Sequence, residues 1–133
     1  MIYLDSSALL KLVVSEPESA ALAAWLAVQS EAPVVSSELA KVEVLRACRR
    51  IAPLALPGAR ELLSGVDLVP LRGAVIEAAA ELEGSALRSL DALHLASALA
   101  IKASLDAFVG YDTRLQSAAA AAGLPTTSPG AAA

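Results

Sequence analysis

The feature that most constrains this chain is a regular alternation of short apolar runs with longer helical patterns. Four runs have the length and the polar boundaries of buried strands, at residues 2–4, 33–35, 67–70 and 107–109. A helical pattern follows each run, and Thr126 and Thr127 form a candidate edge strand. This order predicts an α/β fold of three layers, α/β/α, with a central, mostly parallel sheet of four to five strands.

Capping and helix-breaking residues predict where the helices lie. We expect helices at about residues 20–29, 37–51, 57–65, 72–82, 90–103 and 113–123. A chain of 133 residues has room for one compact core, so residues 1–128 are predicted to form a single domain. The last five residues, 129–133, are rich in Pro, Gly and Ala and are predicted to be a frayed tail.

Composition excludes several classes of function. Ten Lys and Arg against fourteen Asp and Glu give a net charge of -4, so no overall positive field attracts nucleic acid or an anionic membrane. Any contact with nucleic acid must therefore be local. One cysteine, Cys48, and one histidine, His94, cannot form an internal disulfide or a zinc cluster. Without a secretory pattern or a long apolar segment, a cytoplasmic location is expected.

Acidic residues occur where a parallel sheet places its ligands, just beyond the carboxyl ends of the strands. Asp5 follows the first strand, Glu43 lies on the helix after the second, and Asp112 closely follows residues 107–109. Asp91 lies in the first turn of an apolar helix, where an ionised carboxylate needs a partner. Clustered carboxylates repel one another, and Mg²⁺ or Mn²⁺ removes that repulsion and can activate a water molecule for attack on a phosphate.

At this point the sequence resembles the PIN-domain ribonucleases and, within them, the VapC toxins of bacterial toxin-antitoxin pairs. The four acids are separated by 38, 48 and 21 residues, and the resemblance spans nearly the whole chain. Each matching segment is a weak motif alone, but the ordered set is specific. The segments are Tyr3 to Lys11, Val42 to Arg46, Leu90 to Ala98 and Tyr111 to Leu115.

The resemblance implies a PIN-like fold and an endoribonuclease that depends on Mg²⁺ or Mn²⁺. It also implies an RNA substrate, a cognate VapB-type antitoxin, no membrane partner and a homodimer. The four acidic positions of the family, which are both catalytic and metal-binding, map to Asp5, Glu43, Asp91 and Asp112. Family members often carry Thr or Ser two residues before the last acid. This chain has Gly110 there, so we expect a hydroxyl contact near Asp112 to be missing.

Further residues are predicted to support this site. Ser7 is expected to orient the Asp5 carboxylate as a hydrogen-bond donor. Arg46 and Arg50 share a helix face with Glu43 and are candidates for contacts with RNA phosphates, the alternative being exposed ion pairs. Arg114 and Lys11 are likewise candidate RNA contacts or solvated surface charges.

Several of these residues also have an ordinary structural interpretation. Asp5 and Asp112 are suited to cap helices, and Asp91 would complement a helix dipole. We interpret His94, three residues after Asp91, as a core histidine rather than a general base. An apolar stripe on the early helix is predicted to pack in the core or bind a partner, and it comprises Leu22, Trp25 and Leu26.

Two alternatives belong to other functional classes. One is a catalytically silent PIN module that binds RNA or protein, although the presence of all four acids argues against it. The other is a phosphoryl-transfer enzyme with an aspartate nucleophile. Its haloacid-dehalogenase version normally has a second Asp two residues after the first, where this chain has Ser7.

Overall fold

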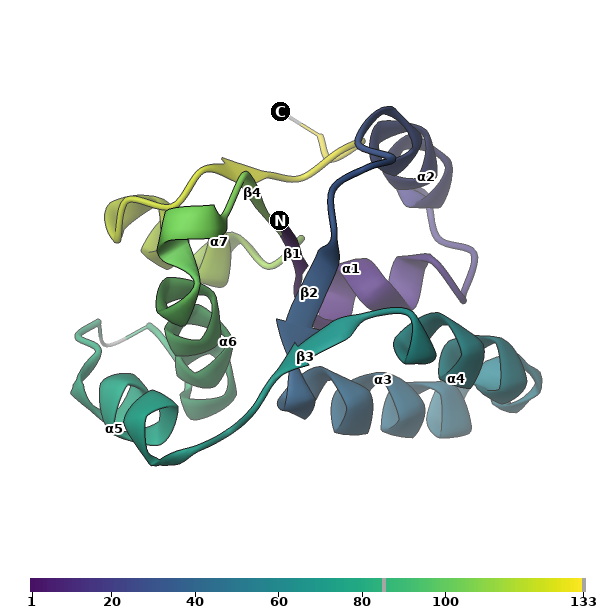
Figure 1. Cartoon of the computed structure of the whole chain (residues 1–133). Helices are drawn as coiled ribbons and strands as arrows, with labels where there is room; N and C mark the ends of the chain where they lie inside the picture. The colour runs from purple at the N-terminus through teal and green to yellow at the C-terminus, as the bar shows by residue number, and fades with distance from the viewer. Residues whose placement is uncertain (85, 133) are drawn as a thin grey trace.

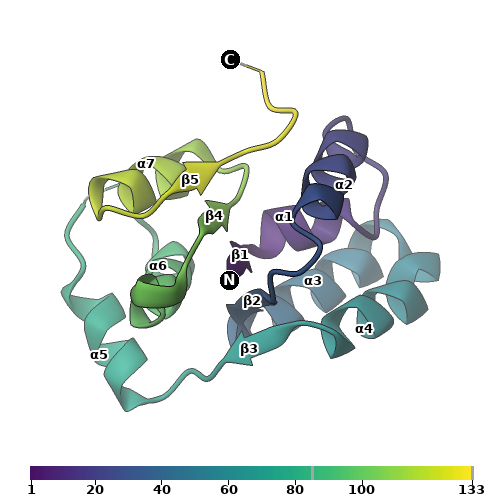
Figure 2. The same cartoon turned by 45° about the horizontal axis from the view of Figure 1, so that its top comes forward.

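A computed structural model describes residues 1–84 and 86–132. Its centre is a five-stranded sheet in which every pairing is parallel, in the order β3-β2-β1-β4-β5 (Figures 1 and 2). The predicted α/β class and strand positions are therefore confirmed. The strands are β1 (Ile2–Leu4), β2 (Val34–Ser37), β3 (Asp67–Val69), β4 (Ala107–Val109) and β5 (Thr126–Thr127).

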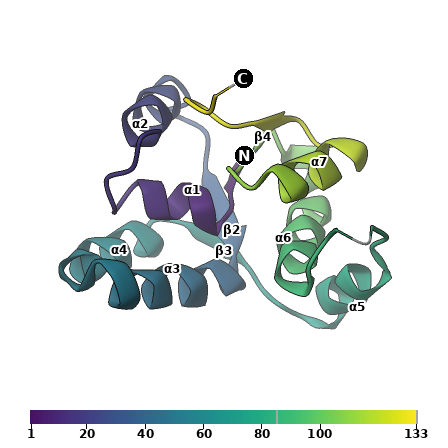
Figure 3. The same cartoon turned by 180° about the vertical axis from the view of Figure 1, so that it is seen from behind.

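Helices cover both faces of the sheet, as Figures 1 and 3 show from opposite sides. One face carries α1 (Ser6–Lys11), α2 (Ser19–Val28), α3 (Glu38–Ile51) and α4 (Leu56–Ser64), with a short 3-10 turn at Pro53–Ala55. The other carries α5 (Gly73–Glu81), α6 (Ser89–Ala100) and α7 (Thr113–Ala121), with a 3-10 turn at Lys102–Ser104. No helix in the described ranges is long and apolar enough to cross a membrane.

The alternation of side chains along β1 divides the core between these two layers. Ile2 and Leu4 pack with Leu9 and Val44 beneath α1 to α4. Tyr3 points the other way and packs with Phe108 on the α6 and α7 side. Because successive residues of a strand face opposite sides of the sheet, Ile2, Tyr3 and Leu4 contribute to the core on both faces of the sheet.

The strand order places a topological switch at the centre of the sheet. After β1 the chain builds outward through β2 and β3, then returns to add β4 and β5 on the other side of β1. The register pairs Tyr3 with Phe108 and Leu4 with Val109, so β1 and β4 end side by side. A crevice opens beyond the carboxyl ends of strands at such a switch. Asp5 and the segment from Gly110 to Asp112 leave the sheet at that point.

The last residues, 129–133, are predicted to be a frayed tail, and the structure gives Pro129 and Gly130 contacts with the rest of the fold. The tail runs across to α2 (Figure 2), and the Tyr111 hydroxyl donates to the Pro129 carbonyl at 2.7 Å. Gly130 has φ 83° and lies so close to α2 that a β-carbon would come within 2.7 Å of Ala21 Cβ. Glycine suits both the left-handed backbone and the close approach. Residue 133 lies outside the described residues.

Candidate active site

Asp5 lies at the end of β1 and is almost completely buried, with 3% of its surface exposed. Its carboxylate caps α1: Oδ1 accepts hydrogen bonds from Ser7 Oγ at 2.6 Å and from the Ala8 amide at 3.0 Å. Burial raises the pKa of Asp5 even though these hydrogen bonds favour the charged form. The structure thus shows both the helix cap and the hydrogen bond from Ser7, and both hold the Oδ1 atom of Asp5 in place.

Glu43 reaches the same region from the first half of α3. Its Oε1 accepts from Ser6 Oγ at 2.5 Å and lies 2.7 Å from His94 Nε2. Burial opposes its ionisation, but the interactions with His94 and Ser6 together outweigh burial and lower the pKa of Glu43. The adjacent serines, Ser6 and Ser7, therefore each hold one acid through one of its two carboxylate oxygens.

His94 connects this acid to the core of the sheet. It is 3% exposed, and its Nδ1 lies 2.7 Å from the hydroxyl of Tyr3. Sequence reasoning identified His94 as buried but missed its contacts with Ser6, Glu43 and Tyr3. Its position three residues after Asp91 was the one available signal, because that spacing puts both side chains on one helix face.

Asp91 and Asp112 come to the site from the other helical layer. Asp91 is half-buried in the first turn of α6. Burial is the main cause that raises its pKa, and the negative charge of Asp112 is the second. Asp112 is exposed and caps α7, where Oδ1 accepts from the amides of Arg114 at 2.9 Å and Leu115 at 3.1 Å. Glu43 also raises the pKa of Asp91. The three negative charges are thus electrostatically coupled.

The side chains of the four acids have the chemistry that a hard divalent cation requires of its ligands. Within residues 1–84 and 86–132, no three His, Cys, Asp or Glu side chains are already gathered into a metal-binding cluster. The donor chemistry nevertheless fits, because carboxylate oxygens are the ligands that Mg²⁺ and Mn²⁺ prefer. The hydrogen bonds recorded for the Asp5 and Glu43 carboxylates reach Oδ1 and Oε1, which leaves Oδ2 and Oε2 as possible ligands.

The predicted arginines lie beside the acids, along the exposed side of α3. Arg46 and Arg50 line a cavity of about 530 Å³ together with Ser6, Ser7 and Glu43. They also line a neighbouring hollow of about 400 Å³, where Arg49 joins them. Sequence reasoning did not select Arg49, although it is adjacent to Arg50. Arg114 is exposed at the start of α7, next to Asp112.

Lys11, a candidate RNA contact or solvated surface charge, is surrounded by acidic and aromatic side chains. Its side chain is buried, and its Nζ lies 2.7 Å from Glu18 Oε2 and 3.6 Å from Glu16 Oε2. The ammonium also lies 4.7 Å from the centre of the Tyr111 ring. Two carboxylates and a ring face already satisfy this charge, so a contact with RNA would require Lys11 to exchange these partners.

The sequence agrees with one protein family over most of its length. The PIN-domain family profile matches residues 2–121. The chain is 47% identical to Ribonuclease VapC47 of Mycobacterium tuberculosis strain CDC 1551 / Oshkosh, over 98% of both chains. It is 41% identical to Ribonuclease VapC46 of strain ATCC 25618 / H37Rv, over 96% of this chain and 97% of that protein. The chain belongs to the PIN-domain family and, within it, to the VapC group. The resemblance seen in the sequence is therefore confirmed.

Solved structures of two VapC-containing proteins share the fold of this chain. Mycobacterium tuberculosis VapC20, described as a toxin that cleaves the sarcin-ricin loop, superposes with a TM-score of 0.68 at 20% identity, covering 93% of this chain and 96% of that one. A chain of VapBC2 from Rickettsia felis, bound to a DNA fragment from its promoter, gives 0.67 at 12% identity and covers 97% and 99%. At such low identities these matches establish the VapC fold.

Gly110, where this VapC chain departs from the family pattern, lies against the acidic site. A β-carbon at this position would lie 2.5 Å from Asp5 Oδ2 and 2.9 Å from Gln116 Oε1. Gln116 donates through Nε2 to the Thr127 carbonyl, and its buried Oε1 has no partner among the residues described. The glycine therefore leaves room for the Asp5 carboxylate. Sequence reasoning predicted only the missing hydroxyl and did not find Gln116.

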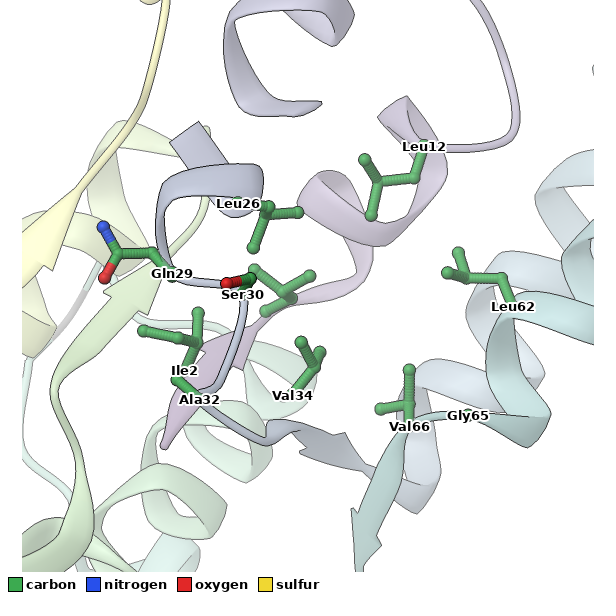
Figure 4. A pocket seen from close by; sticks show the side chains of 11 residues that line it. Ile2, Leu12, Leu26, Gln29, Ser30, Ala32, Val34, Leu62, Gly65 and Val66 are labelled. Atoms are coloured by element: carbon green, nitrogen blue, oxygen red, sulfur yellow. The ribbon is translucent and has the colours of Figure 1, made fainter. Parts of the chain in front are cut away.

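A separate cavity of this VapC fold lies away from the acids. It measures about 260 Å³ and is lined mainly by apolar side chains, including Leu12, Leu26 and Leu62 (Figure 4). Of the predicted stripe on α2, Leu26 lines this cavity and Trp25 is half-buried. Leu22 is completely buried in the core, so it is excluded from any docking surface.

Proposed function

We propose that the protein is a divalent-metal-dependent endoribonuclease and the toxin of a VapBC-type toxin-antitoxin pair. One observation carries the proposal: at the crevice beside β1 and β4, Ser6 and Ser7 hold Glu43 and Asp5 through one oxygen each. Asp91 adds a further acid whose pKa is raised by Glu43, and Asp112 adds a fourth that raises the pKa of Asp91. The names of the VapC ribonucleases that the chain resembles support RNA as the substrate.

In this proposal Asp5, Glu43, Asp91 and Asp112 hold Mg²⁺ or Mn²⁺ and form the catalytic centre. When bound, the ion would supply an activated water and neutralise charge on the scissile phosphate. The carboxylates of Asp5, Glu43 and Asp112 are already oriented by hydrogen bonds, so fewer side-chain rotations must be restricted on binding. Burial raises the pKa of Asp5, and a nearby cation would favour its charged form.

The RNA backbone is proposed to follow α3. Arg46 and Arg50 line both the cavity beside Glu43 and the adjacent hollow, and Arg49 extends this row of positive charge. Guanidinium groups bind phosphate in a bidentate manner, which suits a protein whose overall charge is negative and whose contacts must be local. Arg114, beside Asp112, is proposed as a contact on the other side of the acids. A contact between Lys11 and RNA requires Lys11 to exchange its ion pairs with Glu16 and Glu18 for an RNA phosphate.

Cleavage assays with purified protein test this function. RNA should be cut with Mg²⁺ or Mn²⁺ and remain intact with EDTA, and Asp5→Asn should abolish cleavage while the protein stays folded. Asp67→Asn, a change at an exposed acid on β3, is the matched control and should cleave normally. Full activity in chelator, or in Asp5→Asn, would rule out the metal mechanism. A folded wild type that binds RNA without cutting it would instead favour a catalytically silent module.

The antitoxin is proposed to dock beside α2. Leu26 lines the apolar cavity between α2 and α4 (Figure 4). Trp25 lies on the same helix and packs against the core. An apolar segment of the partner would fill this cavity, and a basic side chain of the same partner would reach the acids. The solved VapBC2 structure from Rickettsia felis carries the name of a VapB and VapC pair, which supports a partner for this chain. A cytoplasmic location would be consistent with this RNA and this partner.

A homodimer is also proposed, as the family resemblance implies. Val42 and Leu90 line the cavity that contains Glu43, yet each leaves about half of its surface exposed, 55% and 49% respectively. A second copy that covered these two side chains would bury them and narrow the approach to the acids. Light scattering of the isolated protein measures its oligomeric state directly, and a monomer at all concentrations would exclude the dimer.

A further inference from the structure

A line of polar contacts runs from the core of the sheet to one of the acids. Tyr3, on the central strand, is completely buried and stacks on Phe108 with 5.1 Å between ring centres. Its hydroxyl lies 2.7 Å from His94 Nδ1, and His94 Nε2 lies 2.7 Å from Glu43 Oε1. Strand β1, helix α6 and helix α3 each contribute one of the three side chains.

We propose that Tyr3 and His94 are positioning residues for Glu43. In this arrangement the Tyr3 hydroxyl donates to Nδ1, the Nε2 proton is directed to Glu43 Oε1, and Oε2 is left for the metal ion. This inference rests on the proposed function, because its consequence is the affinity of the acidic site for a divalent cation. It assigns neither residue a contact with the substrate.

The chemistry of the three groups determines the direction of each hydrogen bond. An ionised carboxylate can only accept, so Nε2 must be the nitrogen that carries the proton. A neutral imidazole then has an unprotonated Nδ1, which can only accept, and the Tyr3 hydroxyl is the donor within reach. Because the stacking on Phe108 holds the Tyr3 ring, its hydroxyl provides a fixed reference for the imidazole.

Glu43 needs such a reference more than Asp5 does. Asp5 has a short side chain and accepts a hydrogen bond from a backbone amide, which places it directly on the fold. Glu43 has a longer side chain, and both of its recorded partners, Ser6 and His94, are side chains themselves. Residues that orient a metal ligand in this way typically change metal affinity by about 10–100-fold when they are removed.

The test uses the fact that His94 is the only histidine in the chain. A long-range ¹H–¹⁵N spectrum therefore reports on this ring alone, and wild type should show a protonated Nε2 and an unprotonated Nδ1. Tyr3→Phe removes the hydroxyl and keeps the stacked ring, so it should disturb this single tautomer and weaken Mn²⁺ binding by about 10-fold or more. Titration calorimetry measures the affinity without RNA.

Matched variants separate positioning from general stability. Tyr111→Phe removes the other tyrosine hydroxyl, which binds the Pro129 carbonyl, and should change neither the spectrum nor the Mn²⁺ affinity. His94→Gln keeps an N–H that can reach a carboxylate and should restore much of the affinity that His94→Leu loses. Should His94→Leu fail to fold, Tyr3→Phe still provides the test.

Three results would overturn the proposal: a protonated Nδ1 in wild type, two protonated ring nitrogens, or a folded Tyr3→Phe protein with unchanged spectrum and Mn²⁺ affinity. The last result, with normal RNA cleavage, leaves the proposed function intact. If wild type binds no Mn²⁺, the metal-dependent function fails instead. The ¹⁵N spectra of wild type and Tyr3→Phe then decide the hydrogen-bond arrangement by themselves.

Discussion

Gly110 lies so close to Asp5 that a β-carbon at position 110 would come within 2.5 Å of the carboxylate oxygen Oδ2. The backbone of Gly110 does not have a positive φ, so the requirement for glycine here is steric. Thr or Ser at this position would displace either Asp5 or Gln116. The glycine is therefore a feature of this particular acidic site, which combines a deeply buried Asp5 with a glutamine from α7.

Gly110→Ala should accordingly destabilise the protein and impair cleavage, because the new methyl group displaces Asp5. Overpacking of this kind typically costs about 1–3 kcal/mol in the free energy of unfolding. Gly73→Ala is the matched control: nothing lies within 4 Å of its β-carbon, and the change in α5 should stabilise by about 0.4–1 kcal/mol. Urea unfolding measures both. Equal stability of Gly110→Ala and wild type would show that the site has room for a side chain.

Asp91→Asn should raise the melting temperature of the protein in chelator, because it removes a charge that Asp112 and Glu43 repel. It should also reduce the stabilisation by Mg²⁺, which for an intact site at 100 times its dissociation constant is about 2.7 kcal/mol. Thermal melts at fixed ionic strength, with and without Mg²⁺, measure both effects. Glu77→Gln, at an exposed acid on α5, is the control.

The opposite result would identify Asp91 as a simple helix-dipole residue in the first turn of α6. Asp91→Asn would then lower stability by about 0.3–1 kcal/mol and leave the response to Mg²⁺ unchanged. Since the two interpretations predict opposite signs in chelator, one pair of melts distinguishes them.

The pH dependence of stability should reflect the raised pKa values of Asp5 and Asp91. As pH rises above 3.8, the ordinary pKa of these carboxyl groups, they stay protonated to a higher pH in the folded state than in the unfolded state. Stability in chelator should therefore fall as pH rises from 3.8 through the folded pKa values. Glu43 acts in the opposite sense, since its lowered pKa makes stability fall as pH decreases below 4.5.

Urea unfolding across the acidic range, with chelator present, measures this profile. Asp5→Asn should flatten the fall above pH 3.8. A profile that is the same in wild type and Asp5→Asn would mean that the buried Asp5 carboxyl titrates as it does in the unfolded chain.

The surface beside α2 should determine binding of the antitoxin. Trp25→Ala combined with Leu26→Ala should weaken the complex, because these changes remove apolar area from the α2 surface. Val28→Ala, on the same helix at a position 80% exposed, should leave binding unchanged. Co-purification and titration with the co-expressed partner measure the effect, after melts have shown that each variant is folded. An undiminished affinity of the double variant would place the antitoxin elsewhere.

The sequence by itself determined the fold and was enough to select most residues of the candidate acidic site. Alternating apolar runs and helical patterns specify a parallel sheet, and parallel strands gather the residues that follow them at one edge. Asp5, Asp112 and Ser7 could be selected for that reason, since each lies close in sequence to a strand end. Their helix caps are equally local, and the structure shows the caps of Asp5 and Asp112 as well.

Only the tertiary structure decided which side chains meet across the sheet. Ser6 reaches Glu43, His94 lies between Glu43 and Tyr3, and these contacts join positions 37, 51 and 91 residues apart. They depend on the placement of β1 between β2 and β4, which no local pattern encodes. The same reason accounts for Leu22 in the core and for Gly110 against Asp5. Local periodicity specifies the direction in which a side chain points, but its partner depends on how distant elements pack.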